Sequence, residues 1–343
     1  MSRRPIAVTM GEPAGVGGEI SLKAWIVRNR QSVPDFFLID DPQRIKTLAQ
    51  RLGLKLPLQT ITHPAEASAA FNDALPILPQ ALAESSVPGV INTQNASAVI
   101  GSITRAVDFV ISGEACALVT NPIQKSALYQ AGFEYPGHTE FLAHLCKEKL
   151  GLKEAPTPVM MLAVDDLRTV PATIHIPLSQ VAGALSIDLI KNLLTIMADA
   201  LKNDFAISNP RIAVTGLNPH AGEDGALGSE EIEIIKPAIE ALRASGLNVT
   251  GPHPADTLFH PRARAEYDGV LAMYHDQALI PIKTVDFDRG VNVTLGLPII
   301  RTSPDHGTAL DLAGTGKASP ASFIEALYTA HFITNIHAQR EAT

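Results

Sequence analysis

The sequence lacks the features that mark several large protein classes. Its 343 residues include two cysteines, too few for a disulfide framework or a four-thiolate zinc site. The longest uncharged stretches, Ser85–Thr104 and Thr169–Ile187, are interrupted by polar residues and proline, so we expect no transmembrane helix and no membrane partner. No long apolar segment follows the arginines at positions 3 and 4, so the sequence predicts no signal peptide and a cytoplasmic protein.

Positive charge is also scarce. The formal net charge is −8, and no basic face is evident, which argues against a dedicated nucleic-acid binder. What is abundant is apolar material: 46% of residues are hydrophobic and only 18% charged, which excludes wholesale disorder. At roughly 150 residues per domain, the length predicts two domains. The eleven histidines require an explanation.

Short apolar segments alternate with segments of helical periodicity, which predicts an α/β fold with a mainly parallel sheet. The predicted strands are Ile6–Met10, Phe36–Ile39, Ala115–Thr120, Val159–Ala163, Arg211–Gly216, Gly269–Tyr274 and Val291–Leu295. The predicted helices are Gly17–Arg30, Pro42–Leu52, Ala96–Ser112, Thr139–Lys149, Leu178–Leu201, Ser229–Ala244 and Pro320–His337. We expect Pro64–Pro88 to be an irregular connection, and Thr157–Pro177 to form a hairpin that serves as an arm or a subunit interface.

The glycine-rich segment Thr9–Glu19 follows a predicted strand and begins a helix. Backbone N–H groups at such a helix start bind anions, which favours a phosphate loop. However, neither G-x-G-x-x-G nor G-x-x-x-x-G-K-[ST] is present, and Glu12 and Glu19 would repel a phosphate. A tight turn with close backbone packing is the favoured interpretation, and phosphate binding stays open.

Pro136–Glu140 contains a histidine and a threonine at a predicted helix start. The glycine permits a tight turn, Thr139 is able to cap the helix, and His138 lies just outside it. This arrangement suits an anion, but it is equally typical of an ordinary capped helix.

Three further histidines, His175, His220 and His275, each lie beside the end of a predicted strand. Open α/β sheets bind ligands at the carboxyl ends of their strands, and neutral imidazoles suit a divalent ion that keeps an open position. Any single histidine is more often structural, so a site built from all three is a hypothesis.

Two C-terminal segments carry polar groups. Lys283, Asn292 and Arg301 are donors around the predicted strand Val291–Leu295, suited to a phosphate or carboxylate or, alternatively, to a solvated edge. The following segment, Ser303–Gly316, is rich in small residues and is either a structural turn or a loop around an adenosine.

Taken together, these segments resemble the 4-hydroxythreonine-4-phosphate dehydrogenase family of pyridoxine (vitamin B6) biosynthesis over nearly the whole chain. The motifs that carry the resemblance are Met10-Gly-Glu-Pro-Ala-Gly, Thr120-Asn-Pro-Ile, Pro136-Gly-His-Thr-Glu, Leu217-Asn-Pro-His-Ala-Gly-Glu, Pro254-Ala-Asp-Thr-Leu-Phe, Met273-Tyr-His-Asp-Gln and Val291-Asn-Val-Thr-Leu-Gly-Leu-Pro.

The resemblance implies two interleaved α/β domains of the isocitrate/isopropylmalate dehydrogenase type. The expected domains are residues 1–130 with 300–343, on the cofactor side, and residues 131–299, with the metal ligands and the dimer interface. It further implies a homodimer, with each active site in an interdomain cleft at that interface.

The resemblance also implies roles for individual residues. Three histidines match the family's metal ligands, one of them supplied across the dimer: His175, His220 and His275. Matching substrate-binding positions are His138, Thr139, Lys283, Asn292 and Arg301. Asp256 and Asp276 are expected near the metal as catalytic groups, with Asp256 as the candidate base. The cofactor loop is expected at Asp305, His306, Gly307 and Thr308.

Such an enzyme would oxidise 4-phosphooxy-L-threonine to 2-amino-3-oxo-4-(phosphooxy)butanoate, which decarboxylates to 3-amino-2-oxopropyl phosphate. The implied cofactors are NAD or NADP and one divalent ion per subunit, Zn²⁺, Mg²⁺ or Co²⁺. One alternative is a related dehydrogenase acting on threonate or erythronate 4-phosphate. The others are a metal-dependent phosphatase or acyltransferase on the same fold, and a non-catalytic metabolite-binding protein.

Overall fold

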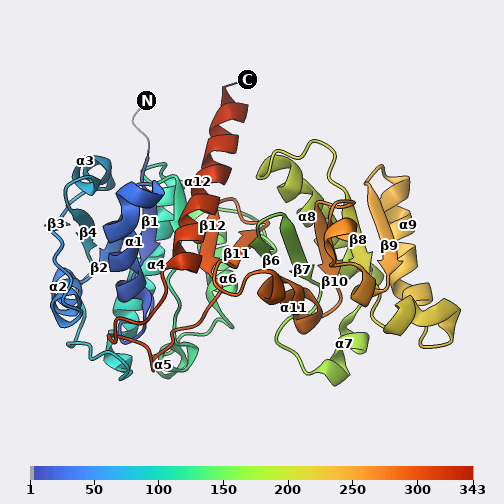
Figure 1. Ribbon diagram of the computed structural model, residues 1–343, viewed down its shortest axis with the longest axis horizontal. Coiled ribbons are helices and arrows are strands. Elements are labelled where there is room, and N and C mark those ends of the chain that lie inside the picture. Colours follow the sequence, from blue (N-terminus) through green and yellow to red (C-terminus); the bar gives the residue numbers. More distant parts are fainter. Residues whose placement is uncertain (1–3, 343) are drawn as a thin grey trace. The chain divides into compact units, whose positions relative to one another are not determined.

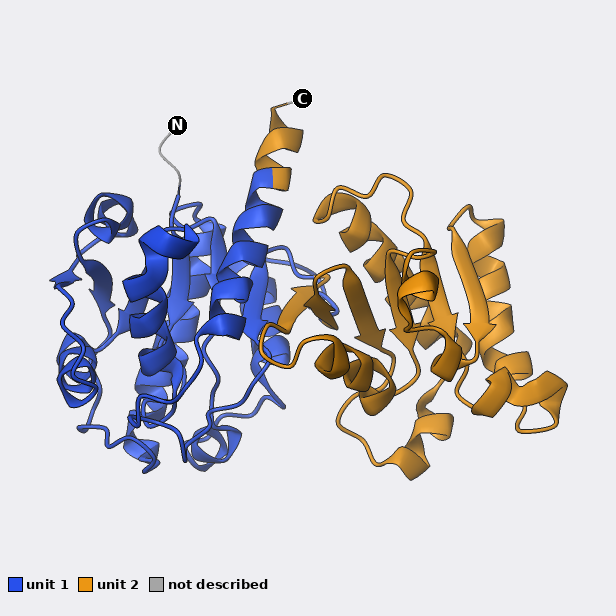
Figure 2. Ribbon diagram, in the orientation of Figure 1, with its two compact units in different colours: residues 1–158, 297–335 blue, residues 159–296, 336–343 orange. Residues whose placement is uncertain are grey.

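The computed structural model describes residues 4–342 and divides the chain into two compact units. Unit 1 comprises Met1–Pro158 and Leu297–Asn335, and unit 2 comprises Val159–Gly296 and Ile336–Thr343 (Figure 2). The boundaries expected from the sequence were 130/131 and 299/300, whereas the compact units divide at 158/159, 296/297 and 335/336. Each unit is an α/β structure, as the alternation of segments predicted.

Unit 1 is built on a parallel sheet with the strand order β3-β4-β2-β1-β5-β12. Its strands are β1 (Ile6–Thr9), β2 (Phe36–Asp40), β3 (Leu58–Thr60), β4 (Leu75–Pro79), β5 (Ala117–Val119) and β12 (Arg301–Pro304). Every residue of β1, β2 and β5 is buried, as expected of parallel strands that are covered on both faces.

The helices of unit 1 pack around this sheet (Figure 1). They are α1 (Gly17–Gln31), α2 (Pro42–Arg51), α3 (Ala67–Phe71), α4 (Ala96–Ile111), α5 (Lys125–Gln130), α6 (His138–Leu150) and the first part of α12 (Ala321–Glu341). One core cluster joins Ile103 of α4 and Leu142 of α6 to Phe37 and Leu118 of the sheet. Because α6 contributes to this core, it belongs to unit 1.

Unit 2 has a mixed sheet with the order β11-β6-β7-β10-β8-β9. Its strands are β6 (Val159–Val164), β7 (Leu167–Pro171), β8 (Ile212–Thr215), β9 (Val249–His253), β10 (Gly269–Ala272) and β11 (Val291–Leu295). Strands β7, β10, β8 and β9 are parallel, whereas β6 is antiparallel to both β7 and β11. The predicted hairpin is confirmed as β6 and β7, but it lies within the sheet and does not project as an arm.

The helices of unit 2 correct two predictions. They are α7 (Leu178–Ala184), α8 (Ile187–Asn203), α9 (Lys236–Ala244), α10 (Pro261–Arg264) and α11 (His275–Val285). The single helix predicted over Leu178–Leu201 is two helices, because Leu185 is extended and the Ser186 hydroxyl accepts the Leu189 N–H to begin α8. The helix predicted from Ser229 begins instead with a π-helical turn, η4 (Glu231–Ile235).

The expectation of an irregular Pro64–Pro88 connection was also wrong. This segment contains α3 and β4, and in β4 the residues Leu75, Ile77 and Leu78 are buried and interspersed with prolines at 76 and 79. The prolines obscured the apolar pattern in the sequence. Strands β3, β9 and β12 and helices α5 and α11 were likewise not predicted.

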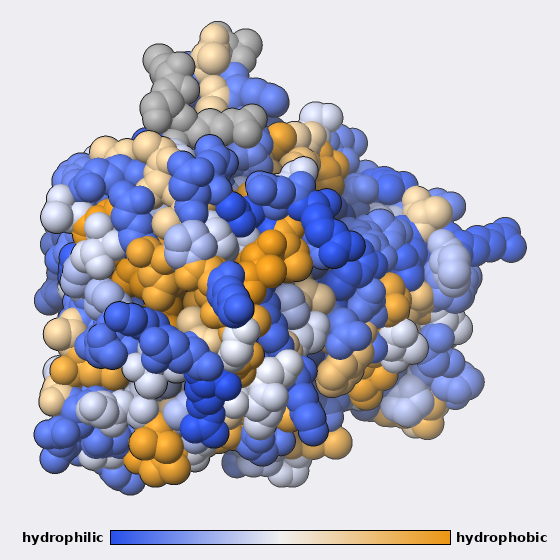
Figure 3. Space-filling model, turned by 60° about the vertical axis from the view of Figure 1, so that its left-hand side comes forward, coloured by the Kyte–Doolittle hydropathy of each residue, from blue (hydrophilic) through white to orange (hydrophobic). Residues whose placement is uncertain are grey.

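The face of the molecule in Figure 3 is largely hydrophilic, with apolar side chains gathered in patches between the charged ones. Within residues 4–342, no single helix is long and apolar enough to cross a membrane; α7 and α8 reach that length only together, and they are bent by 91° at their break.

Candidate active site

In unit 1, the loop after β1 is packed tightly against the loop after β5. The Glu12 N–H donates to the Pro122 carbonyl at 2.8 Å, and the Asn121 side-chain amide donates to the Thr9 carbonyl at 2.9 Å. Gly11 has φ +67°, and a Cβ there would lie 2.6 Å from the Asn121 Cβ. The glycine-rich segment is therefore a tight turn with close backbone packing.

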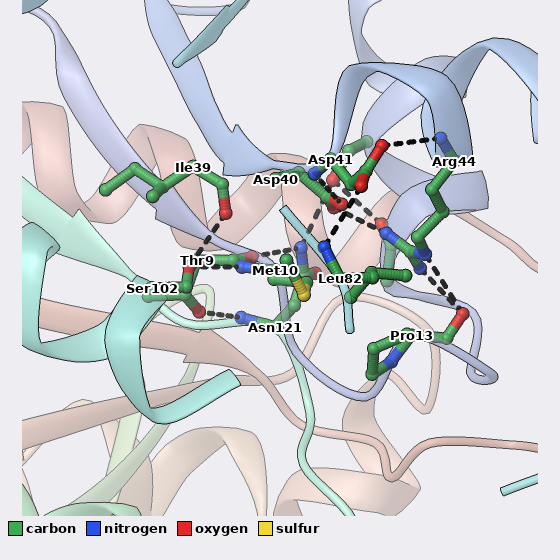
Figure 4. A network of polar contacts seen from close by, with 12 residues as sticks. Thr9, Met10, Pro13, Ile39, Asp40, Asp41, Arg44, Leu82, Ser102 and Asn121 are labelled. Atoms are coloured by element: carbon green, nitrogen blue, oxygen red, sulfur yellow. Dashed lines mark hydrogen bonds and ion pairs between the residues drawn. The ribbon is translucent and has the colours of Figure 1, made fainter. Parts of the chain in front are cut away.

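A buried ion pair is hydrogen-bonded to this turn (Figure 4). The Arg44 guanidinium pairs with Asp40 and donates twice to the Pro13 carbonyl, from Nε at 3.1 Å and from Nη2 at 2.9 Å. Ser102 accepts the Met10 N–H at 2.9 Å and donates to the carbonyl at the end of β2. Burial raises the pKa of Asp40, and the neighbouring Arg44 opposes that shift.

A second cationic group lies at the start of α6. Arg301, on β12, is 5% exposed, and its Nε and Nη2 donate to the Thr120 hydroxyl at 3.1 and 2.6 Å. Burial lowers the pKa of Arg301 to about 10, and the nearby Glu140 opposes that shift. At neutral pH the guanidinium therefore remains charged.

His138 is the first residue of α6 and faces this group. Burial, together with the positive charges of Arg301 and Lys125, holds the pKa of His138 well below its ordinary value. Its Nε2 is buried and has no hydrogen-bond partner among the described residues. A buried polar atom without a partner is uncommon in native proteins and indicates a place for a ligand group or water.

Two details differ from the sequence interpretation of this segment. The helix begins at His138 with Gly137 at the N-cap, so Thr139 lies inside the helix and donates to Glu140 at 2.8 Å instead of capping. Lys125 was not predicted as a site residue. Its Nζ lies close to Gly137, 3.3 Å from where a Cβ on that glycine would be, and its charge acts on His138. A lysine that opens a helix shortly after the Thr120-Asn-Pro-Ile motif was the available signal.

The predicted cofactor loop packs against the glycine turn. The Thr308 carbonyl accepts the Val16 N–H at 3.0 Å, and the Thr308 hydroxyl donates to Gln124 at 3.1 Å. The Asp305 N–H donates to Ser322 at 2.9 Å, so the loop is fixed at both ends. His306 Nε2 is buried without a partner among the described residues.

A cavity of about 490 Å³ lies beside this loop, at the carboxyl ends of β1, β2 and β4. Its walls are Pro13 and Gly15 after β1, one face of α2, and residues 82–88 after β4. Both its size and its position at the strand ends are typical of a ligand pocket in an open α/β sheet.

In unit 2, the three candidate metal ligands follow three adjacent parallel strands, β7, β10 and β8. The His175 and His275 rings lie 5.9 Å apart, centroid to centroid, at 42°. Thr173 holds their strand ends together by donating to the Met273 carbonyl through its N–H (3.2 Å) and its hydroxyl (2.8 Å). These two histidines also line a cavity of about 250 Å³.

Asp276 orients one of these rings. Its Oδ1 lies 2.7 Å from His275 Nδ1, which leaves Nε2 as the nitrogen available to a metal. A carboxylate behind a ligating histidine is the usual second partner of such rings. The two imidazoles and their carboxylate therefore fit a divalent ion.

The other predicted residues of unit 2 lie on separate elements. His220 is exposed in a turn after β8, and no set of three His, Cys, Asp or Glu side chains within residues 4–342 forms a metal cluster. Asp256 is exposed in the short helix η5 (Ala255–Thr257), which packs against the His220 turn. Lys283 lies in the last turn of α11, and Asn292 lies in β11 with its Oδ1 buried and without a described partner.

The class to which the chain belongs follows from the fold, because two solved structures that superpose on it at more than 25% identity are dehydrogenases. A 4-hydroxythreonine-4-phosphate dehydrogenase from Klebsiella pneumoniae matches with a TM-score of 0.85 and 38% identity, over 96% of this chain and 99% of that one. A terephthalate 1,2-cis-dihydrodiol dehydrogenase from Burkholderia xenovorans matches with a TM-score of 0.63 and 27% identity, over 96% and 98%.

The particular family follows from the sequence comparisons. A family model described as pyridoxal phosphate biosynthetic protein PdxA matches residues 32–330, and the chain belongs to this family. A curated 4-hydroxythreonine-4-phosphate dehydrogenase from Xanthobacter autotrophicus is 47% identical over 338 residues, 98% of this chain and 96% of that protein. The resemblance inferred from the motifs is thereby confirmed.

Proposed function

We propose that this protein oxidises the 3-hydroxyl of 4-phosphooxy-L-threonine and passes the hydride to NAD or NADP. The observation that carries the proposal is the buried cation of Arg301, with His138 and the more exposed Lys125 beside it, in a chain whose curated relatives carry the name of this activity. The product is 2-amino-3-oxo-4-(phosphooxy)butanoate, a β-keto acid that loses CO₂ to give 3-amino-2-oxopropyl phosphate.

The unit 1 group is suited to the phosphate ester. Arg301 offers a fixed planar fork, Lys125 adds a second charge, and the first turn of α6 contributes its positive dipole end. Because His138 is held neutral, its Nε2 is able to donate one hydrogen bond without adding a charge. Lys283, Asn292 and Thr139 remain proposed substrate contacts.

The unit 2 histidines are suited to a divalent ion, Zn²⁺, Mg²⁺ or Co²⁺, which when bound supplies Lewis-acid polarisation of the substrate hydroxyl. His175 and His275 would hold it, with Asp276 fixing the His275 ring. Asp256 is the proposed base that accepts the hydroxyl proton, directly or through water.

We propose that His220 reaches this ion from a second copy of the chain, in a homodimer. Two observations support the proposal: residues 4–342 of one chain form no cluster of three ligands, and the cavity beside His175 has exposed apolar walls. Leu178 is 71% exposed and Ile176 39%, and exposed apolar groups at a site mark a surface that a partner covers.

The dinucleotide, which accepts the hydride, is proposed to bind unit 1 at the loop of Asp305, His306, Gly307 and Thr308. The Thr308 carbonyl accepts the Val16 N–H, and the preceding residue, Gly15, lines the 490 Å³ cavity. That cavity is large enough for a nucleoside, and we propose that it receives the adenosine half of the cofactor.

A substrate panel tests the proposed function. Purified protein is stripped of metal, reloaded with Zn²⁺, Mg²⁺ or Co²⁺, and given 4-phosphooxy-L-threonine, threonate 4-phosphate or erythronate 4-phosphate with each dinucleotide. We expect reduced dinucleotide to form fastest with the threonine ester. Faster oxidation of threonate or erythronate phosphate would establish the alternative dehydrogenase, and release of phosphate without reduced dinucleotide would establish a phosphatase.

A second candidate function is oxidation of another phosphorylated hydroxy acid, such as threonate or erythronate 4-phosphate, because one relative with this fold is named for a different substrate. The Burkholderia xenovorans relative covers 96% of this chain, yet its name gives a dihydrodiol as its substrate. The shared fold therefore does not determine the substrate by itself. The side chains that line the active site must select it.

A further inference from the structure

The loop that carries His220 has an unusual backbone. Five consecutive residues, His220, Ala221, Gly222, Glu223 and Asp224, have φ between 44° and 79°. Left-handed conformations are unfavourable for residues with a Cβ, so a run of them persists only where neighbouring groups impose it. The groups packed against this turn therefore help to determine where the His220 ring lies.

A buried carboxylate, Glu231 in the π-helical turn η4, lies against this turn. Glu231 is 1% exposed, and its two carboxylate oxygens are both used by one residue. Oε1 accepts the Asn218 backbone N–H at 2.7 Å, and Oε2 accepts the Asn218 side-chain amide at 2.9 Å. Asn218 lies two residues before His220, so this double hydrogen bond fixes the chain where the left-handed turn begins.

Two glycines let the carboxylate reach this place. A Cβ on Gly216 would lie 3.0 Å from Glu231 Oε1, and a Cβ on Gly222 would lie 2.7 Å from Glu231 Oε2. The carboxylate thus fills the space left by a glycine before His220 and a glycine after it. Its donors are amide groups, so the bonds specify a backbone geometry and do not simply neutralise a charge.

We propose that Glu231 is a positioning residue that holds the His220 turn in the left-handed form in which the imidazole is presented to the divalent ion. The proposal rests on the metal-binding role of His220 proposed above. It gives a function to a buried glutamate that touches neither the proposed substrate contacts nor the proposed cofactor loop.

The test is the Co²⁺ affinity of the full-length protein carrying Glu231→Gln. The glutamine keeps the volume between the two glycines but replaces one acceptor by an N–H₂ donor that faces the donors of Asn218. A flip of the Asn218 amide would not repair the contact, because its Nδ2 also donates to Glu230 at 2.7 Å.

We expect Co²⁺ to bind about 10- to 100-fold more weakly, as is typical when a group behind a metal ligand is lost, and its visible absorption spectrum to change. The metal-free variant should keep the wild-type circular dichroism spectrum. Glu233→Gln, an exposed residue in the same turn, makes the same charge change and should leave both the affinity and the spectrum unchanged.

Asn218→Ala provides an independent route if Glu231→Gln does not fold. It removes the side-chain donor but keeps the backbone bond to Oε1, and we expect a smaller loss of Co²⁺ affinity in the same direction. In the double variant the losses should not add, because both changes remove the same contact.

Wild-type Co²⁺ affinity and spectrum in folded Glu231→Gln, with weakened binding in His220→Ala, would overturn the positioning role and leave the metal site intact. Unchanged Co²⁺ binding in His220→Ala would overturn the metal role itself, and with it the basis of this inference.

Discussion

At the scale of single residues, burial sets the charge state of the groups in unit 1. Arg301 stays charged although burial lowers its pKa to about 10, whereas His138 is kept neutral by burial and by two neighbouring cations. The two groups are therefore suited to different tasks. We propose that Arg301 supplies charge to the substrate and that His138 supplies a directed hydrogen bond.

Arg301→Met tests the first task, because it keeps most of the side-chain volume and removes the guanidinium. A charged hydrogen bond contributes about 1.5–3 kcal/mol, so the KM for the phosphorylated substrate should rise about 10- to 100-fold. Steady-state kinetics on the phosphorylated substrate and its unphosphorylated analogue provide the measurement. Arg243→Met, at an exposed position on α9, is the control, and equal losses on both substrates would contradict a phosphate role for Arg301.

His138 predicts a pH dependence of stability. Its pKa is depressed in the folded protein, so protons bind the unfolded chain preferentially below the ordinary histidine pKa of about 6.5, and stability falls as the pH falls. One such proton contributes a slope of at most about 1.4 kcal/mol per pH unit.

The measurement is urea unfolding of the wild type and His138→Gln between about pH 7 and pH 5. We expect the wild type to lose more stability than the variant over this range. Buried carboxyls such as Glu12 and Asp40, whose pKa values are raised, act in the opposite direction and are common to both proteins. Parallel pH profiles would show that His138 titrates normally.

At the scale of elements, the segments that the sequence predicts best are those with one clear period. Val291–Leu295 forms β11 with the predicted bounds, and Gly17, Pro42 and Ala96 all begin helices as predicted. One failure comes from a local interruption of a long pattern. The break at Ser186 between α7 and α8 lies inside a continuous apolar period and depends on one cap.

Ser186→Ala should destabilise the protein by about 1 kcal/mol, the usual cost of losing an N-cap hydroxyl. Its hydroxyl accepts the Leu189 N–H at 3.1 Å, and alanine leaves that donor without its partner. Urea unfolding at neutral pH measures the change, with Ser208→Ala in an exposed loop as the control. No difference between the two variants would mean that water replaces the cap fully.

At the scale of the whole molecule, we propose that the metal site is built from two chains. His175 and His275 are neighbours within unit 2, and no cluster of three ligands within residues 4–342 includes His220 with them. If a second copy supplies His220, mixing two inactive variants should restore enzyme activity only for particular pairs of substitutions. The recovery depends on which chain of the dimer carries each substitution.

Three variants, His175→Ala, His220→Ala and His275→Ala, are mixed in pairs after mild dissociation and reassembly. Pairs that include His220→Ala should regain about a quarter of wild-type activity, because half of the dimers are hybrids with one intact site in two. The pair of His175→Ala and His275→Ala should regain none, because every hybrid site then lacks a ligand. Recovery in that pair would place these two ligands on different chains.

The sequence by itself determined the α/β class, the family, and the position of three histidines beside strand ends. These follow from local patterns, since apolar period and turn residues are encoded by neighbours in the chain. Only the tertiary structure decided that β7, β10 and β8 are adjacent, that Lys125 lies beside His138, and that Glu231 reaches Asn218. Each of these contacts joins residues that are distant along the chain, and packing, not local propensity, determines which of them meet.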